Sequence, residues 1–280
     1  MSNASSLLAL YQNDRFWLVA VDSVLIGMIA FLFFAGVLTW IAARDPLWAR
    51  RWRIQNTRGT GGISADEATR RGILVQGGNM VRQSLKIWLL NNLWMLAGTA
   101  VAWPLMSLSG IHLGAAPALW MVLLQLLFFI YLDDFLYYWM HRAMHTRWLL
   151  KHIHSVHHRV LAPWAITGNY MHAAEYVLTG TLMFIGPALI GCHVSVLWLW
   201  VIFRQWEAAE GHCGYAFPWS PTHWLPFSHG ALHHDYHHAR VRGNYGGFLP
   251  IWDQIFGTTV KDYEQAIRQW RTLHTTRTTT

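Results

Sequence analysis

The sequence has few cysteines, few charged residues and less acidic than basic charge. Its 280 residues include only Cys192 and Cys213, which excludes a disulfide framework, a CxxC pair and a thiolate metal site. Any metal must therefore be held by histidine. The sequence also lacks a GxGxxG fingerprint, a CxxCH haem motif and a ferredoxin cysteine set, so electrons for any redox chemistry must come from elsewhere.

Apolar residues dominate what is present. Hydrophobic residues make up 54% of the chain and charged residues only 12%, which is about half the share in soluble proteins. The 18 tryptophans fit a membrane protein, because tryptophan prefers the boundary between hydrocarbon and water. The net charge of +7 comes from basic residues that flank apolar runs, so we predict no nucleic-acid partner. These features predict a single membrane-embedded domain over residues 1–280.

Three apolar runs are long enough to cross a bilayer, at residues 17–43, 87–108 and 117–139. The N-terminus lacks the basic start and the cleavage site of a signal peptide, so the first run is expected to stay in the mature protein. The arginine-rich stretch between the first two runs is predicted to be cytoplasmic by the positive-inside rule. Two further crossings return the chain to that side before residue 141.

The last apolar stretch, residues 176–206, is too long for one span and too short for two. Gly186, Pro187 and Gly191 interrupt it near its middle, which predicts a helical hairpin that dips into the membrane and returns. The segments 141–175 and 207–258 then form a cytoplasmic cap. The predicted fold is all-α, a multi-pass membrane bundle of four to five embedded helical elements with this cap.

Histidines occur in three groups within about 100 residues, one HxxxH string and two HxxHH strings. On a helix, residues three or four apart share a face, so each string could hold a common ion or two adjacent ones. Imidazole suits iron, zinc, copper and nickel, and eight such rings exceed the needs of one ion, so we predict two metals. The core candidates are His141, His145, His154, His157, His158, His234, His237 and His238.

Two further histidines are candidate ligands. His212 ends the predicted hairpin, where it could complete the site, whereas His172 could equally be a ligand or a capping residue. We expect His152, His229 and His233 to flank the site without binding metal. Metal-bound imidazole usually donates its other N–H to a carboxylate or carbonyl. The predicted supporting residues are Asp134, Tyr138, Glu175 and Asp235, although Asp133 and Asp134 could instead be helix-end charges.

The segments DDFLYYWMHRAMH, KHIHSVHH, EGHCGYAFPWSP and ALHHDYHHARVRGNYGGFLPIWDQIFGT resemble the fatty acid hydroxylase and sterol desaturase superfamily of membrane diiron enzymes. The likeness runs from about Asp133 to Thr258. It implies that the eight core histidines and His212 bind two iron ions, and that Asn244 and Asp253 brace the loop and helix after the third group. EGHCGYAFPWSP followed by HHDYHH is most similar to the sterol C4-methyl oxidases.

The resemblance implies an oxidoreductase that uses O2 to hydroxylate or desaturate a C–H bond of a sterol or another lipid. A fatty-acyl hydroxylase or desaturase with the same site is an alternative. The electrons would come from a separate protein of the ferredoxin or cytochrome b5 type, and we expect an acidic carrier to dock on the basic cytoplasmic face.

Two rival functions belong to other classes. A histidine-rich metal transporter would place its ligands at mid-membrane depth, inside the helices. A zinc-dependent hydrolase would need three ligands, an open position and a carboxylate base, which is fewer ligands than the sequence offers.

Overall fold

The computed structural model describes residues 8–55, 62–247 and 249–275, and within these ranges it contains helices and no β-strand. The long helices are α2 (Asp22–Arg44), α5 (Gly78–Met106), α6 (Leu119–Met144), α8 (Ala173–Ile190) and α9 (Val194–Gly211). A π-helical turn, η1 (Phe16–Val21), leads into α2. The short elements are α3 (Leu47–Arg50), α4 (Ala65–Arg70), α7 (Arg147–His152), α10 (Ala231–Arg240), α11 (Ile251–Ile255) and α12 (Tyr263–Thr275), with 3₁₀ turns η2 (His154–Arg159), η3 (Ala165–Thr167) and η4 (Pro221–Trp224).

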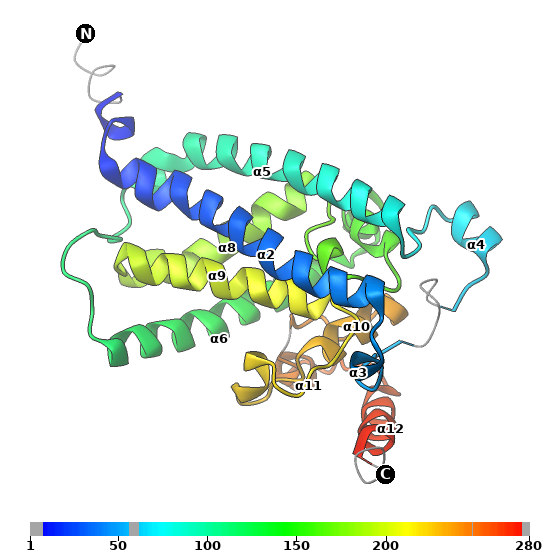
Figure 1. Ribbon diagram of the computed structural model, residues 1–280. Coiled ribbons are helices and arrows are strands. Elements are labelled where there is room, and N and C mark those ends of the chain that lie inside the picture. Colours follow the sequence, from blue (N-terminus) through cyan, green and yellow to red (C-terminus); the bar gives the residue numbers. More distant parts are fainter. Residues whose placement is uncertain (1–7, 56–61, 248, 276–280) are drawn as a thin grey trace.

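The long helices form a membrane-type bundle. They run side by side in Figure 1, and α3, α4, α10 and α12 gather at one end of them. Within the part of the chain that the structure describes, three helical segments are long and apolar enough to cross a membrane, namely Phe16–Arg44, Leu119–Met144 and Ala173–Ile190. Large apolar side chains such as Ile29, Phe33 and Leu123 are exposed on them, as expected of surfaces that face lipid. The prediction of an all-helical membrane bundle is confirmed.

Two connections meet at the end of the bundle that lies away from the short helices. The segment between α5 and α6 touches the turn between α8 and α9, where the His112 N–H donates to Cys192 O and the Val194 N–H donates to His112 O. Gly191 (φ +64°) is needed at this turn, because a Cβ there would lie 2.9 Å from Gly110 O. The helices that follow these two connections, α6 and α9, therefore both run back to the opposite end of the bundle, where the histidines lie.

The chain reverses at Gly191, one of the three residues expected to interrupt this stretch. Gly186 and Pro187 instead lie inside α8, which continues to Ile190. Proline is tolerated here because the Met183 carbonyl, which has no N–H of residue 187 to accept from, accepts instead from Nε1 of Trp200 at 2.9 Å. The helix α5 also begins at Gly78, earlier than the apolar run suggested.

Gly168 lets the segment between η2 and α8 pack closely against α9. A Cβ on this residue would lie 2.4 Å from the backbone oxygen of Ala208 and 3.2 Å from Nδ1 of His212. Real side chains do not approach backbone so closely, so any larger residue must push the two segments apart. This contact fixes the position of the C-terminal end of α9 and of His212 beside it.

We predict that Gly168→Ala lowers the free energy of unfolding by about 1–3 kcal/mol, the usual cost of overpacking. Thermal unfolding in detergent micelles measures the change. The matched control is Gly36→Ala on α2, where a Cβ meets nothing within 4 Å; alanine is the better helix former there. Equal unfolding temperatures for the two variants would contradict the close packing of Gly168.

Candidate metal centre

Nine histidines converge at the end of the bundle in two adjacent groups. In each group one nitrogen from every ring lies within 4.8 Å of the corresponding nitrogens of the others. The five-histidine group consists of His141, His145, His154, His158 and His237, and the four-histidine group of His157, His212, His234 and His238. The groups adjoin, since the ring centroids of His158 and His238 are 5.2 Å apart.

Separate elements carry these rings to one place. His141 lies in the last turn of α6, and His145 is the residue that ends this helix. His212 ends α9 in the same way, which is the position expected of a ligand at the end of the hairpin. The second string forms the 3₁₀ turn η2 rather than the α-helical face that the spacing suggested. The third string lies on α10, as an α-helix.

Each HxxHH string serves both groups. His154 and His158 belong to the five-histidine group, while His157 between them belongs to the other. The third string is divided the other way round, because His234 and His238 enter the four-histidine group and His237 enters the five-histidine group. The middle histidine of each string therefore lies in the group that contains the outer two histidines of the other string. Both groups thus contain residues of η2 and of α10.

The facing nitrogens are in close contact. In the five-histidine group Nε2 of His154 lies 3.1 Å from Nε2 of His141 and 3.0 Å from that of His158, which is itself 3.1 Å from that of His237. In the four-histidine group Nε2 of His212 lies 3.3 Å from that of His157 and 3.0 Å from that of His234. All nine rings are buried except that of His145, which is partly exposed.

Backbone carbonyls fix the orientation of most of these rings. The Nδ1 atoms face carbonyl oxygens in five of them: His141 faces Tyr245 O, His157 Tyr170 O, His212 Ala208 O, His237 Gly243 O and His238 Val160 O, at 2.7–3.0 Å. A carbonyl oxygen only accepts, so each of these Nδ1 atoms carries the hydrogen. Their Nε2 atoms then present lone pairs to the centre of each group.

Burial lowers the pKa of most of these rings. It lowers the pKa of His157 to about 4 and that of His212 to about 3. The pKa values of His158, His234, His237 and His238 are lowered well below 6.5 for the same first reason, with neighbouring histidines adding to the effect. Protonation at neutral pH therefore cannot supply hydrogens to the facing nitrogens.

These observations fit bound cations. His157 and His212 both donate through Nδ1, so neither has a hydrogen to place between their Nε2 atoms. The same holds for His141 and His237, and Nε2 of His238 is buried without a hydrogen-bond partner. Buried lone pairs that point at one another are unfavourable unless a positive ion lies among them. Neutral imidazole is a preferred ligand of several transition metals.

Of the four residues predicted to support the histidines, one forms a hydrogen bond to a histidine ring and three bond other groups. Glu175 accepts from Nδ1 of His154 at 2.7 Å, as a partner of a metal ligand should. Asp134 instead accepts from the Gly247 N–H, and Asp235 from Nε2 of Gln55. Tyr138 bonds Thr258 and accepts from Arg142. None of these three contacts a histidine in the hydrogen bonds of the described residues.

The four other histidines considered from the sequence lie outside both groups. His172 caps α8, and its Nδ1 accepts from the Ala174 N–H, so the capping interpretation describes its position. His233 bonds Asp253 and His229 bonds Tyr263. His152 is exposed at the end of α7.

Asp253 organises the loop that follows α10. Its carboxylate accepts from the backbone N–H groups of Tyr245 and Gly246 and from the Thr258 hydroxyl. Tyr245 is the residue whose carbonyl orients His141, so Asp253 acts on the site through one residue. Asn244 also braces the loop, because its side-chain oxygen accepts from the Val260 N–H.

Sequence reasoning missed two charged residues near the histidines, Arg204 and Glu207, and considered Asp133 only as a supporting residue or a helix-end charge. Arg204 on α9 is paired with Asp133 on α6 at 2.9 Å and with Glu207. Arg204 and Glu207 line the same small cavity as His157, His212 and His234. Their signal in the sequence was a set of charges inside apolar runs, which are costly in a membrane unless they are paired.

We predict that Glu175→Ala weakens metal binding about 10–100-fold, the usual effect of removing the partner of a metal-bound histidine. Glu175→Gln keeps an acceptor oxygen for His154 and should weaken binding less. Competition with a chelator, followed by metal analysis, measures the affinity. Glu210→Gln is the control, because this buried carboxylate bonds Thr222 rather than a histidine. Unchanged affinity in Glu175→Ala would contradict the role of Glu175.

Comparison with known proteins places the site within a matched region. Residues 126–258 match the family model described as fatty acid hydroxylase. These residues include all nine clustered histidines.

Curated relatives carry names of two kinds. The very-long-chain aldehyde decarbonylase GL1-11 of Oryza sativa subsp. japonica is 47% identical over 151 residues, which are 52% of this chain and 56% of that protein. Methylsterol monooxygenase 2-2 of Arabidopsis thaliana is 46% identical over 137 residues, 48% of this chain and 52% of that protein. The chain thus spans about half the length of the curated relatives it matches. No solved structure matches. The predicted likeness to this superfamily is confirmed.

Proposed function

We propose that this chain, whose residues 126–258 form a fatty acid hydroxylase domain, is a membrane-bound non-haem diiron oxygenase that oxidises a C–H bond of a sterol or another lipid. It would use O2 and electrons from an external donor. The observation that carries the proposal is the pair of adjacent groups of mostly buried imidazoles, whose Nε2 atoms face one another. Two groups side by side favour two ions.

The five-histidine group would hold one iron ion and the four-histidine group the other. When bound, the iron pair supplies the redox chemistry with O2 that breaks an unactivated C–H bond. The chain itself holds the rings in fixed orientations through Tyr245, Tyr170, Ala208, Gly243 and Val160 carbonyls. Its burial of the rings also excludes water from the reaction.

The depth of the histidines supports an oxygenase over a transporter. A transporter would hold its ions midway along the spanning helices. Here His141 lies in the last turn of α6, and the other ligands lie on the short elements and helix ends beyond it. Nine histidine ligands also exceed the three of a catalytic zinc site. We therefore propose lipid oxidation, with hydroxylation and desaturation as outcomes that the metal site shares.

The histidine end of the bundle is proposed to face the cytoplasm. Exposed basic residues lie around it, among them Arg147, Lys151 and Arg242, which agrees with the positive-inside rule. Arg242 is near enough to His145 to lower the pKa of that ring, after the larger effects of burial and other histidines. His145 is the one partly exposed ring of the nine, so this surface is the natural entry for electrons.

An acidic electron carrier docking at this surface should be sensitive to salt, because screening weakens attraction between exposed charges. We predict that turnover with a purified carrier and reductase falls as ionic strength rises. Arg242→Glu should raise the carrier concentration needed for half-maximal rate about tenfold, whereas Arg70→Glu on the distant helix α4 should not. Rates that are independent of salt and of Arg242 would refute this docking site.

The ligand assignment is tested by His238→Ala. We expect loss of at least about 100-fold in turnover and a lower iron content, with membrane insertion unchanged, because only the metal site is altered. His152→Ala, which removes an exposed histidine outside both groups, should keep both iron and activity. Iron per protein is measured by mass spectrometry and lipid products by chromatography. Full turnover of His238→Ala would refute its role as an essential ligand.

A further inference from the structure

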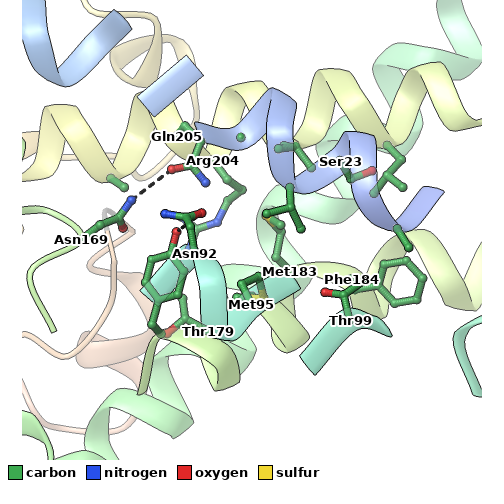
Figure 2. Close-up of a pocket in the computed structure, with 18 of the residues that line it drawn as sticks. Ser23, Asn92, Met95, Thr99, Asn169, Thr179, Met183, Phe184, Arg204 and Gln205 are labelled. Carbon is green, nitrogen blue, oxygen red and sulfur yellow. Dashed lines mark hydrogen bonds between the residues drawn. The ribbon is translucent and has the colours of Figure 1, made fainter. Parts of the chain in front are cut away.

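A cavity inside the bundle adjoins the four-histidine group. It lies between α2, α5, α8 and α9 and has a volume of about 130 Å³, and an apolar groove beside it has a volume of about 510 Å³. Most of its wall is apolar. Figure 2 shows Met95, Met183 and Phe184 in one part of it, and Asn169, Gln205 and Arg204 gathered in another.

This cavity adjoins two others, with which it shares lining residues. Asn169, Thr179 and Arg204 also line the small cavity that contains His157, His212 and His234. At the other side, Met95 and Gly180 also line an apolar groove between α5 and α8. The three cavities therefore follow one another from the outer face of these helices, where Met95 packs on Gly180, to the histidines. The polar end of this series is next to the site, and its apolar end is next to the membrane.

One pair of amides is available to a ligand at the polar end. Nδ2 of Asn169 donates to Oε1 of Gln205 at 3.2 Å, which leaves the Asn169 oxygen and the Gln205 amino group without a partner among the described residues. The neighbouring Asn92 differs, because its oxygen accepts from Tyr176 and its amino group donates to Trp88 O. The Asn169–Gln205 pair therefore offers one donor and one acceptor, which together suit a hydroxyl group.

The charges at this end favour a neutral ligand. The guanidinium of Arg204 is already paired with two carboxylates, those of Asp133 and Glu207. No net positive charge remains there to bind a carboxylate or a phosphate. An anionic head group would also meet Glu207, which lines the cavity beside the histidines. Burial of such a charge without a partner is costly.

We propose that the cavity binds a neutral lipid alcohol, with its hydroxyl on Asn169 and Gln205 and its apolar body toward Met183 and Phe184. If the proposed oxygenase function holds, on which this part rests, the carbon that is oxidised lies only a few bonds from that hydroxyl. The reason is that Asn169 borders both the lipid cavity and the cavity of the histidines. Gln205 and Asn169 are thus specificity-determining residues.

Binding of matched lipids to the iron-loaded protein in micelles tests the proposal. The probes are cholesterol against cholest-5-ene, and hexadecan-1-ol against hexadecane and hexadecanoate. For at least one skeleton we expect the alcohol to bind about threefold to tenfold more tightly, the value of one or two hydrogen bonds, and the carboxylate to bind more weakly than the alcohol. Gln205→Leu should bring the ratio of alcohol to hydrocarbon near one. Comparing ratios between variants cancels each lipid's partition into micelles.

Thr99→Val is the control, since it removes a hydroxyl from the wall of the same cavity away from the amides. It should keep the preference for the alcohol. Equal binding of alcohol and hydrocarbon to the unaltered protein, an unchanged preference in Gln205→Leu, or tighter binding of the carboxylate would overturn the proposal.

Turnover separates this proposal from the proposed function. Retained preference for the alcohol without any O2 consumption would refute the oxygenase and leave the binding site standing. Where turnover occurs, mass spectrometry locates the oxidation. Oxidation close to the hydroxyl supports the placement on Asn169 and Gln205, and oxidation at the far end of the lipid would refute it.

Discussion

The structure depends on one electrostatic constraint, namely that histidine rings are packed in two adjacent groups with nitrogen atoms facing one another. Carbonyl oxygens on the Nδ1 side fix the hydrogens of five rings away from the centre, and burial keeps the rings from taking up protons. Such an arrangement is stable only around positive charge. A metal bound there would join α6, η2, α9 and α10 at this end of the bundle.

The surface of the bundle and its interior near the site differ in the side chains they present. Apolar side chains are exposed on the outside, as suits contact with lipid, whereas buried histidines lie inside, beside an apolar cavity. The Asp133–Arg204–Glu207 cluster lies at the boundary between them. By pairing one cation with two carboxylates, it allows charged residues in the bundle and leaves the adjoining cavity suited to an uncharged ligand.

Backbone geometry gives the site its rigidity. Gly168 allows the segment before α8 to touch α9, which holds His212 in place, and Asp253 holds the loop whose Tyr245 carbonyl orients His141. The supporting partners are thus mainly main-chain oxygens. Since a carbonyl cannot change its charge, these partners orient the rings without altering the charge of the site.

The sequence by itself determined the helical membrane character and which histidines could be ligands. Apolar runs identify helices because a bilayer requires them, and the HxxxH and HxxHH spacings persist whether the segment forms an α-helix, as at α10, or a 3₁₀ turn, as at η2. Glu175 was also predictable as the partner of a ligand. Asp134, Tyr138 and Asp235 were expected near the ligands and instead bond other residues.

Only the tertiary structure decided how the histidines divide between two groups, and which carbonyls orient them. Spacing along one helix is a local property. The placement of His157 with His234 and His238, and of His237 with His154 and His158, depends on how η2 packs against α10. Carbonyl acceptors leave no trace in a sequence, because every residue has one. The partnerships of Arg204 and the Asn169–Gln205 pair likewise join residues from separate elements, so they arise only when the helices pack.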